Sequence, residues 1–156
     1  MGIFVFMEKP HNRQDVLLSI CLPTYNQPQA VSAFLASVAP QLTSEVEVLI
    51  LDDSPTDATK VVTTRYLDNG SIRYIRGKET DITGQDRAVA ALIDKAQGKY
   101  VWTFGDEILE EHAVFTVTSL LKEYPEIVLV WVNSRDFERK SIAADLGGDK
   151  FFRDAN

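Results

Sequence analysis

Apolar residues along this chain follow two alternating patterns. Short runs of consecutive or alternating apolar residues predict strands, and between them apolar residues recur every three or four positions, as on one face of a helix. The predicted strands cover residues 17–22, 45–51, 72–76, 100–104 and 127–132. The predicted helices have their buried faces at Val31, Phe34, Leu35 and Val38, at Ala58, Val61 and Val62, at Val89, Leu92, Ile93 and Ala96, and at Ala113, Val117, Leu120 and Leu121.

Residues that favour helix ends indicate where these helices start and stop. Asn26 and Gln29 have capping-box spacing, and Pro28 suits the first turn of the helix that follows. Ser54 is expected to cap the second helix, with Pro55 at its first position. The third and fourth helices are expected to end at Gly98 and before Pro125.

Strands and helices therefore alternate through the chain, which predicts an α/β fold with a mostly parallel sheet and helices on both faces. Right-handed crossovers place the carboxyl ends of all parallel strands at one edge of the sheet. Ligands bind at that edge in open α/β sheets. Polar residues that helix capping does not explain gather there, at 23–26, 52–53, 77–87 and 106–107.

Two adjacent carboxylates, Asp106 and Glu107, follow the strand predicted at 100–104. A carboxylate at the end of a buried strand needs a cation or hydrogen-bond donors to offset its desolvation. The pair therefore indicates a hard divalent cation that itself holds a phosphate. The alternative is that both residues only start the next helix, whose N-terminus favours negative charge.

Composition narrows the class of protein. The 156 residues are enough for one domain, and the 45% hydrophobic and 25% charged content is that of a globular protein. A net charge of −7 argues against binding nucleic acid. The single cysteine, Cys21, fits a reducing compartment, so we expect a cytoplasmic protein, peripheral at most at the inner face of the membrane. No apolar run approaches the ~18 residues that span a bilayer, and residues 1–15 are expected to be a flexible lead-in.

Several well-known sites are missing from the sequence. The chain has no Gly-x-Gly-x-x-Gly, no P-loop and no Gly-x-Ser-x-Gly motif. Cys21 is expected in the core, and His112 is expected to face solvent or cap a helix rather than touch a ligand.

Three segments together resemble the family 2 glycosyltransferases of GT-A fold: residues 19–26 (Ser-Ile-Cys-Leu-Pro-Thr-Tyr-Asn), 48–59 (Val-Leu-Ile-Leu-Asp-Asp-Ser-Pro-Thr-Asp-Ala-Thr) and 98–107 (Gly-Lys-Tyr-Val-Trp-Thr-Phe-Gly-Asp-Glu). The segment 84–87 (Gly-Gln-Asp-Arg) and the Trp-x-Phe-Gly-Asp ending most resemble the abequosyltransferase-like branch. The resemblance covers about residues 16–135 and implies a nucleotide-sugar-binding half. Residues 136–156 are then an irregular tail that starts an acceptor-binding part.

The resemblance implies a role for individual residues. Tyr25 packs against the nucleotide base and Asp53 accepts a hydrogen bond from it, while Arg87 faces the nucleotide or its phosphates. Asp106 and Glu107 fill the Asp-x-Asp role, one near the ribose and one on a Mn²⁺ or Mg²⁺ ion that bridges the diphosphate. The implied nucleotide-binding residues are thus Pro23, Thr24, Tyr25, Asn26, Asp53, Arg87 and Asp106, and the implied metal ligands are Asp106 and Glu107.

The chain departs from the family pattern in two ways. The usual motif has Asp where Phe104 and Glu107 stand. The second departure is length. Family members carry an acceptor-binding half after these strands, with the carboxylate that acts as general base in an inverting transfer, and this chain is expected to stop before that half. Only Asp136 is a candidate for that base here, so the catalytic residue is left open.

The expected function is the donor-binding part of a glycosyltransferase, which transfers a sugar from a nucleotide diphosphate-sugar to a glycan or lipid-linked acceptor. The alternative is a noncatalytic nucleotide-sugar-binding remnant. A phospho-acceptor receiver domain also gathers acidic residues at strand ends, but it needs a lysine after the last strand, where residues 132–134 are Val-Asn-Ser.

Overall fold

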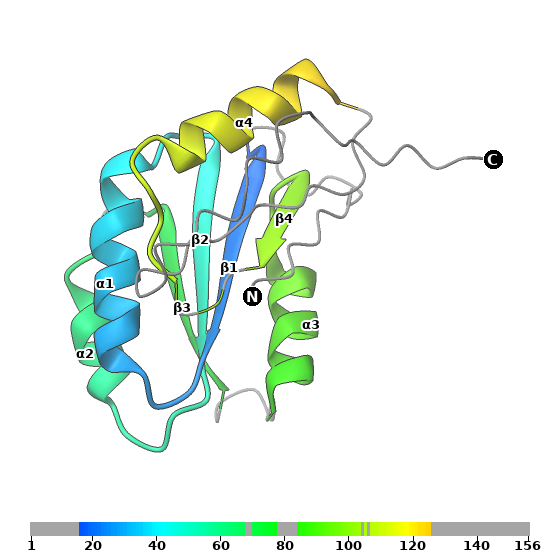
Figure 1. Cartoon of the computed structure of the whole chain (residues 1–156). Helices are drawn as coiled ribbons and strands as arrows, with labels where there is room; N and C mark the ends of the chain where they lie inside the picture. Colours follow the sequence, from blue (N-terminus) through cyan, green and yellow to red (C-terminus); the bar gives the residue numbers. More distant parts are fainter. Residues whose placement is uncertain (1–15, 68–69, 78–83, 104, 106, 126–156) are drawn as a thin grey trace, which may run out of the picture.

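The structure is a computed structural model that describes residues 16–67, 70–77, 84–103, 105 and 107–125. Four parallel strands form one sheet in the order β3-β2-β1-β4 (Figure 1). The predicted α/β fold with a parallel sheet is confirmed, while the predicted strand at 127–132, the lead-in 1–15 and the tail 136–156 lie outside the described residues. The strands are β1 (Leu18–Thr24), β2 (Val46–Asp52), β3 (Ile72–Arg76) and β4 (Tyr100–Thr103).

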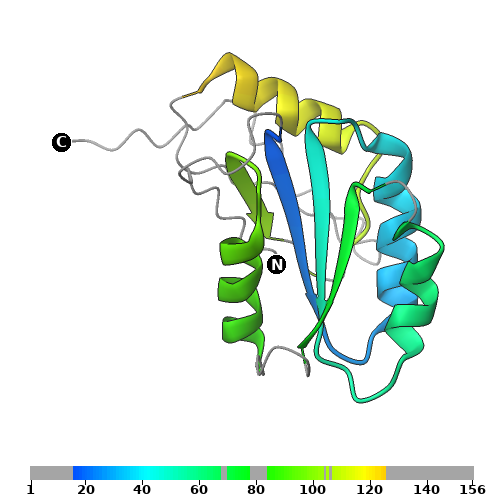
Figure 2. The ribbon, with the colours of Figure 1, turned by 180° about the vertical axis from the view of Figure 1, so that it is seen from behind.

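Helices pack against both faces of this sheet, as predicted. The helices are α1 (Pro28–Val38), α2 (Ala58–Thr64), α3 (Gln85–Lys95) and α4 (Ala113–Glu123), and a 3-10 helix, η1 (Ala39–Gln41), extends α1. Alternate strand residues define two cores: Ile20 and Ile50 pack in a cluster with α1 and α4, and Cys21 and Leu49 pack in a cluster with α3. Figures 1 and 2 show α1 and α3 on opposite sides of the strands, with α4 across their amino ends.

Helix α1 buries the four residues that its periodicity predicts, Val31, Phe34, Leu35 and Val38. The predicted capping box is wrong, because Gln27 is the N-cap residue and no side chain caps the helix. Asn26 instead has a positive φ of 59° and donates its N–H to a residue on another loop, so it turns the chain before the helix starts.

Helix α2 begins at Ala58, later than the sequence predicts. Ser54 does not cap it, because the Ser54 hydroxyl donates instead to Asp52. The buried face also differs: Thr59 and Thr63 are buried, and Val61 is exposed. Each of these threonines is fully buried, and the Thr63 hydroxyl donates to the carbonyl of Thr59 within the helix, which satisfies it in an apolar setting.

The faces of the last two helices are predicted in part. Helix α3 buries Leu92 as expected, and α4 buries Val117 and Leu121, with Val114 and Thr118 in place of Ala113 and Leu120.

Gly98 is needed for a different reason from the one predicted, because α3 already ends at Lys95. A Cβ atom at Gly98 would lie 2.7 Å from the backbone nitrogen of Ser19 on β1, so the turn into β4 approaches β1 too closely for any side chain.

None of the helices in the described part of the chain has the length and apolar character that crossing a membrane requires.

Candidate functional site

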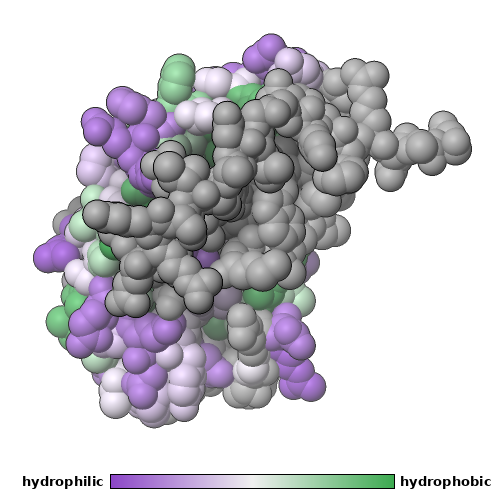
Figure 3. All heavy atoms as spheres, viewed as in Figure 1, coloured by the Kyte–Doolittle hydropathy of each residue, from purple (hydrophilic) through white to green (hydrophobic). Residues whose placement is uncertain are grey.

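The loops that follow β1 and β2, together with the start of α3, lie at the carboxyl edge of the sheet, the lower end of the molecule in Figure 1. Hydrophilic side chains gather over this end in Figure 3. Helices α1, α2 and α3 start at this edge, and no side-chain hydrogen bond from an N-cap residue closes any of the three N-termini. Their N-terminal N–H groups and dipoles thus favour an anion at this edge.

The β1–α1 loop places an aromatic ring in solvent. The side chain of Tyr25 is 61% exposed, although it directly follows the buried end of β1. Thr24 is buried, and its hydroxyl has no hydrogen-bond partner within the described part of the chain. Pro23 is half-buried and pairs in register with Leu51 of β2.

Two hydrogen bonds join the β1–α1 loop to the β2–α2 loop. The Asp53 N–H donates to the carbonyl of Thr24 (3.0 Å), and the Asn26 N–H donates to Ser54 Oγ (2.7 Å). Tyr25 lies between the two bonded residues of the first loop. The structure therefore brings together the two residues that the sequence assigns to the nucleotide base, Tyr25 and Asp53.

The start of α3 is tied to the same place. The N–H of Gly84, which has a φ of 88°, donates to Asp53 Oδ2 at 3.3 Å. Gly84 is the N-cap of α3, so this bond places the start of α3 beside Asp53. Arg87 lies exposed in the first turn of the same helix.

Beneath these loops lies a set of buried and partly buried polar side chains, the Asp52 cluster, formed by Asp52, Ser54, Tyr74 and Arg76. Asp52 is fully buried at the end of β2. It accepts hydrogen bonds from the Ser54 N–H (3.0 Å), the Ser54 hydroxyl, the Tyr74 hydroxyl (2.5 Å) and Arg76 (3.4 Å). Burial and the hydrogen bond to Asp52 raise the pKa of Tyr74 to about 12.

The sequence locates Asp52 at the edge but does not reveal this cluster. Tyr74 and Arg76 enter it because β3 pairs with β2 in a register that sets Asp52 against Arg76. The sequence feature that points to this cluster is Asp-Asp-Ser at the end of β2, whose serine the local pattern instead predicts to be a helix cap.

Only part of the predicted metal site lies among the described residues. Phe104 and Asp106 lie outside the described residues. Glu107 is half-buried, and its Oε2 accepts the N–H of Gly105 at 3.1 Å. Helix α4 begins only at Ala113, so Glu107 is not in the first turn of a helix. Within the described segments no three histidine, cysteine or acidic side chains gather closely enough to hold a metal ion, and the site stays a prediction.

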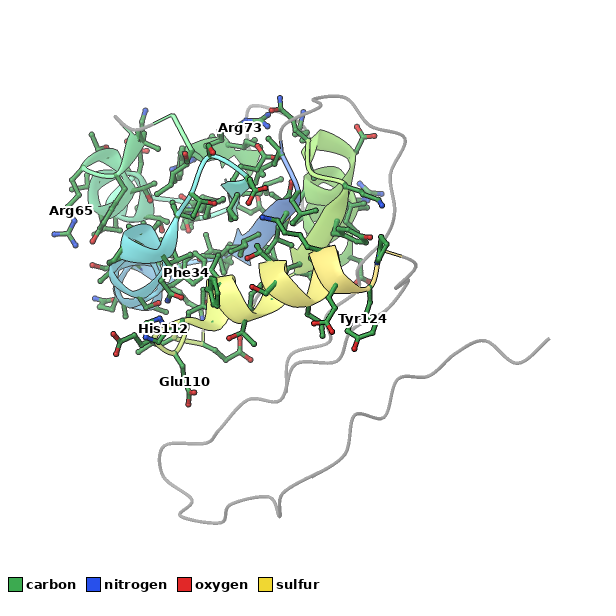
Figure 4. The ribbon with its side chains drawn as sticks, turned by 90° about the horizontal axis from the view of Figure 1, so that it is seen from above. Phe34, Arg65, Arg73, Glu110, His112 and Tyr124 are labelled. Carbon is green, nitrogen blue, oxygen red and sulfur yellow. The ribbon has the colours of Figure 1, made fainter. Side chains whose placement is uncertain are left out.

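His112 faces solvent, as expected. Its side chain is exposed and lies 3.6 Å from Glu111, and its φ of 66° marks the turn into α4 (Figure 4). The amide of Gln41 accepts the N–H of Val114 and donates to the carbonyl of Glu110, so a residue from η1 holds this helix start in place.

An apolar groove of about 440 Å³ lies elsewhere, between α1 and α2. None of the residues that the sequence assigns to a ligand lines it. Its lining residues are Pro28, Gln29, Ser32, Ala33, Ala36 and Val62.

Comparison with known proteins agrees with the fold. The model of the family "Glycosyl transferase family 2" matches residues 19–149, which include every predicted site residue. The chain belongs to glycosyl transferase family 2.

Particular relatives sharpen this assignment. The chain is 28% identical over 134 residues to the abequosyltransferase RfbV of Salmonella typhimurium, a match that covers 84% of this chain and 38% of the relative. It is 25% identical over 126 residues to the chondroitin synthase of Escherichia coli, covering 80% of this chain and 18% of the synthase. The chain thus spans less than two fifths of these relatives, and an abequosyltransferase is among them, as the motifs predict.

Solved structures share the fold. The structure of TarS 1-349 from S. aureus superposes with a TM-score of 0.63 at 23% identity, covering 70% of this chain and 33% of that one. A mannosyltransferase from Pyrobaculum calidifontis, solved with GDP-Man and Mn²⁺, superposes with a TM-score of 0.56 at 20% identity, covering 75% of this chain and 36% of that one. The predicted GT-A architecture is confirmed.

Proposed function

We propose that this chain is the donor-binding part of a glycosyltransferase, which binds a nucleoside diphosphate sugar at the carboxyl edge of its sheet. In this proposal residues 16–135 form the nucleotide-sugar-binding half, and the sugar passes to a glycan or lipid-linked acceptor. The observation that carries the proposal is the pairing of an exposed Tyr25 ring with Asp53 through the hydrogen bonds between their loops.

The chemistry of the two residues suits a nucleotide base. An exposed aromatic ring offers a face for stacking on a flat base, and a carboxylate accepts a hydrogen bond from a base N–H. Pro23, Thr24 and Asn26 shape the loop around the ring. The three helix N-termini that start at this edge suit the negative charge of a diphosphate, and Arg87 adds a positive charge in the first turn of α3.

We also propose that Asp106 and Glu107 hold a divalent cation, Mn²⁺ or Mg²⁺. Carboxylate oxygens are the ligands that such hard ions prefer, and the half-buried Glu107 carboxylate lies just past the end of β4. A bound cation would neutralise charge on the departing nucleoside diphosphate. Support comes from the relatives of similar fold solved with Mn²⁺, the mannosyltransferase above and the glucosyl-3-phosphoglycerate synthase of Mycobacterium tuberculosis.

Transfer to an acceptor hydroxyl also needs a base that removes its proton. The carboxylates assigned above, Asp53, Asp106 and Glu107, all serve the donor. Asp136 is the candidate base that follows them in the sequence.

Calorimetry tests the proposal. The chain is titrated with uridine, thymidine, guanosine and cytidine diphosphates, each with and without Mn²⁺. We expect saturable binding of at least one of them, tighter with the metal, and we expect Asp106→Asn to remove the gain that Mn²⁺ gives. Absence of binding with all four would contradict the proposal.

A further inference from the structure

The Asp52 cluster lies directly under the proposed base-binding residues, and its members Tyr74 and Arg76 are partly buried. Asp52 and Ser54 are both buried, and they flank Asp53 in the sequence. Neither is placed to touch a nucleotide. Ser54 Oγ instead accepts the backbone N–H of Asn26 on the neighbouring loop.

The backbone of Asn26 depends on this cluster. Asn26 has a φ of 59°, in the left-handed region that few non-glycine residues adopt, although asparagine does so more readily than most. The hydrogen bond that its own N–H makes is the one to Ser54 Oγ, a residue 28 positions away. Because Asn26 directly follows Tyr25, this bond holds the backbone next to the residue that carries the exposed ring.

Asp52 determines which way the Ser54 hydroxyl points. A serine hydroxyl donates one hydrogen bond and accepts others, so its orientation is set by the strongest acceptor nearby. Here the hydroxyl hydrogen is donated to Asp52 Oδ1, which leaves a lone pair of the oxygen for the Asn26 N–H. Tyr74 and Arg76 hold the other carboxylate oxygen, Oδ2, and so fix Asp52 itself.

We propose that Asp52 and Ser54 are positioning residues that hold Tyr25 and Asp53 in the geometry that receives a nucleotide. The inference rests on the proposed function. Its physical basis is pre-organisation: a corner of the chain that is already ordered loses less conformational freedom when the ligand binds. Loss of the Ser54 hydroxyl should therefore weaken binding although Ser54 does not contact the ligand.

The chain offers a matched control at the other end of the sheet. Ser19 is also fully buried, its hydroxyl donates to a carboxylate, Glu47 (2.7 Å), and it accepts the N–H of a distant residue, Gly98 (2.8 Å). Ser19→Ala and Ser54→Ala thus each remove one hydrogen bond to a carboxylate and one from a backbone N–H at a buried site, and Ser54→Ala also removes a 3.5 Å contact with the Thr59 hydroxyl. Ser19→Ala has no connection to Tyr25 or Asp53.

The experiment compares the two variants in the full 156-residue chain with the tightest of the four nucleoside diphosphates plus Mn²⁺. We expect Ser54→Ala to raise Kd by about tenfold and Ser19→Ala to leave it within about twofold, the first being the scale of one lost hydrogen bond. Equal Kd values for the two variants at similar losses of thermal stability would overturn the inference. If Ser54→Ala does not fold, Asp52→Asn replaces it, with an increase in Kd in the same direction expected and an unchanged Kd contradicting the inference.

Amide hydrogen exchange separates this inference from the proposed function, because it needs no ligand. Ser54→Ala should speed exchange of the Asn26 amide and leave that of Gly98 unchanged, while Ser19→Ala should do the reverse. A chain that binds no nucleotide contradicts the proposed function, and the positioning role of Ser54 is then decided by exchange alone. Unchanged exchange at Asn26 in Ser54→Ala would overturn it.

Discussion

The two ends of the sheet use the same polar arrangement for different purposes. At each end a buried serine donates to a buried carboxylate and accepts a backbone N–H from a distant segment: Ser19 with Glu47 and Gly98 at the amino end, and Ser54 with Asp52 and Asn26 at the carboxyl end. At the amino end the N–H belongs to a buried glycine, but at the carboxyl end it belongs to an exposed corner beside Tyr25.

The surroundings of the two ends differ accordingly. Helix α4 crosses the amino end, where Lys122 pairs with Glu45 at 2.6 Å, and Arg73, labelled in Figure 4, pairs with Glu47 at 3.2 Å. At the carboxyl end the described loops carry an exposed aromatic ring and helix starts without side-chain caps. The same serine–carboxylate pair thus holds a buried turn at the amino end and, at the carboxyl end, the exposed corner where we propose that a nucleotide binds.

The largest expected effect is a loss of stability on substitution of Glu47 at the amino end of the sheet. Glu47→Ala removes the acceptor of the Ser19 hydroxyl and of the Gln97 N–H, and it leaves Arg73 without this partner. Loss of hydrogen bonds to a buried charge should lower the free energy of unfolding by about 2–4 kcal/mol, measured by urea denaturation.

Glu45→Ala is the matched control, because it removes a carboxylate from an exposed ion pair with Lys122 and should cost at most about 1 kcal/mol. Nucleotide affinity should stay the same in both variants. A drop in affinity with Glu47→Ala would contradict the division between the two ends.

The next effect is expected at the carboxyl end and on binding. Tyr25→Ala removes a ring that is 61% exposed, so it should weaken nucleotide binding by about 1–3 kcal/mol while the free energy of unfolding changes by about 0.5 kcal/mol or less. Phe115→Ala in α4 is the control, since that ring is 71% exposed but lies away from the loops at the carboxyl edge. Calorimetry and a melting curve measure both. Equal nucleotide affinities of Tyr25→Ala and Phe115→Ala would contradict a role for the Tyr25 ring in binding.

Asp53→Ala should act in the same direction by a similar amount, about 1–3 kcal/mol, because it removes the proposed acceptor for a base N–H. Its carboxylate also accepts the Gly84 N–H at 3.3 Å, so a small loss of stability accompanies the loss of affinity. A large drop in the melting temperature of Asp53→Ala with unchanged nucleotide affinity would show that Asp53 stabilises the fold and does not bind the nucleotide. The carboxyl end would then serve packing alone, like the amino end.

The smallest effect concerns pH. Burial and the hydrogen bond to Asp52 raise the pKa of Tyr74 from 10.0 to about 12, so the folded chain holds this proton more tightly than the unfolded chain does. The resulting stability is fully present below pH 10 and is lost as the pH rises from 10.0 toward about 12. Tyr74→Phe cannot ionise, so the stability advantage of the unsubstituted chain over this variant should shrink within that window. Urea denaturation of both chains at about pH 9 and about pH 11 tests this, and a constant difference would contradict it.

The sheet and its order of elements could be predicted from the sequence because strands buried on both faces need long apolar runs. The face of α1 follows from the same argument, since Val31, Phe34, Leu35 and Val38 recur with helical spacing. What the pattern predicts well is therefore the burial of apolar surface.

The helix starts could not be predicted, because tertiary hydrogen bonds override local capping preferences. Asn26 and Ser54 both have the character of cap residues, but the structure pairs them with each other across 28 positions. The Asp52 cluster could not be predicted either, because Tyr74 and Arg76 reach Asp52 only through the pairing of β2 with β3. The motif resemblance implies Tyr25 and Asp53 as site residues, while the residues beneath them become visible only in the fold.

The most direct test of the difference between the two ends is to map the ligand onto the backbone by NMR. The ¹⁵N-labelled chain is titrated with the tightest nucleoside diphosphate and Mg²⁺, and amide shifts are followed at both ends of the sheet. We expect the largest shifts at Tyr25, Asn26, Asp53 and Gly84, and none at Gln97 and Gly98. Shifts centred on Gln97 and Gly98, or binding without shifts at the carboxyl edge, would contradict a nucleotide site at that edge.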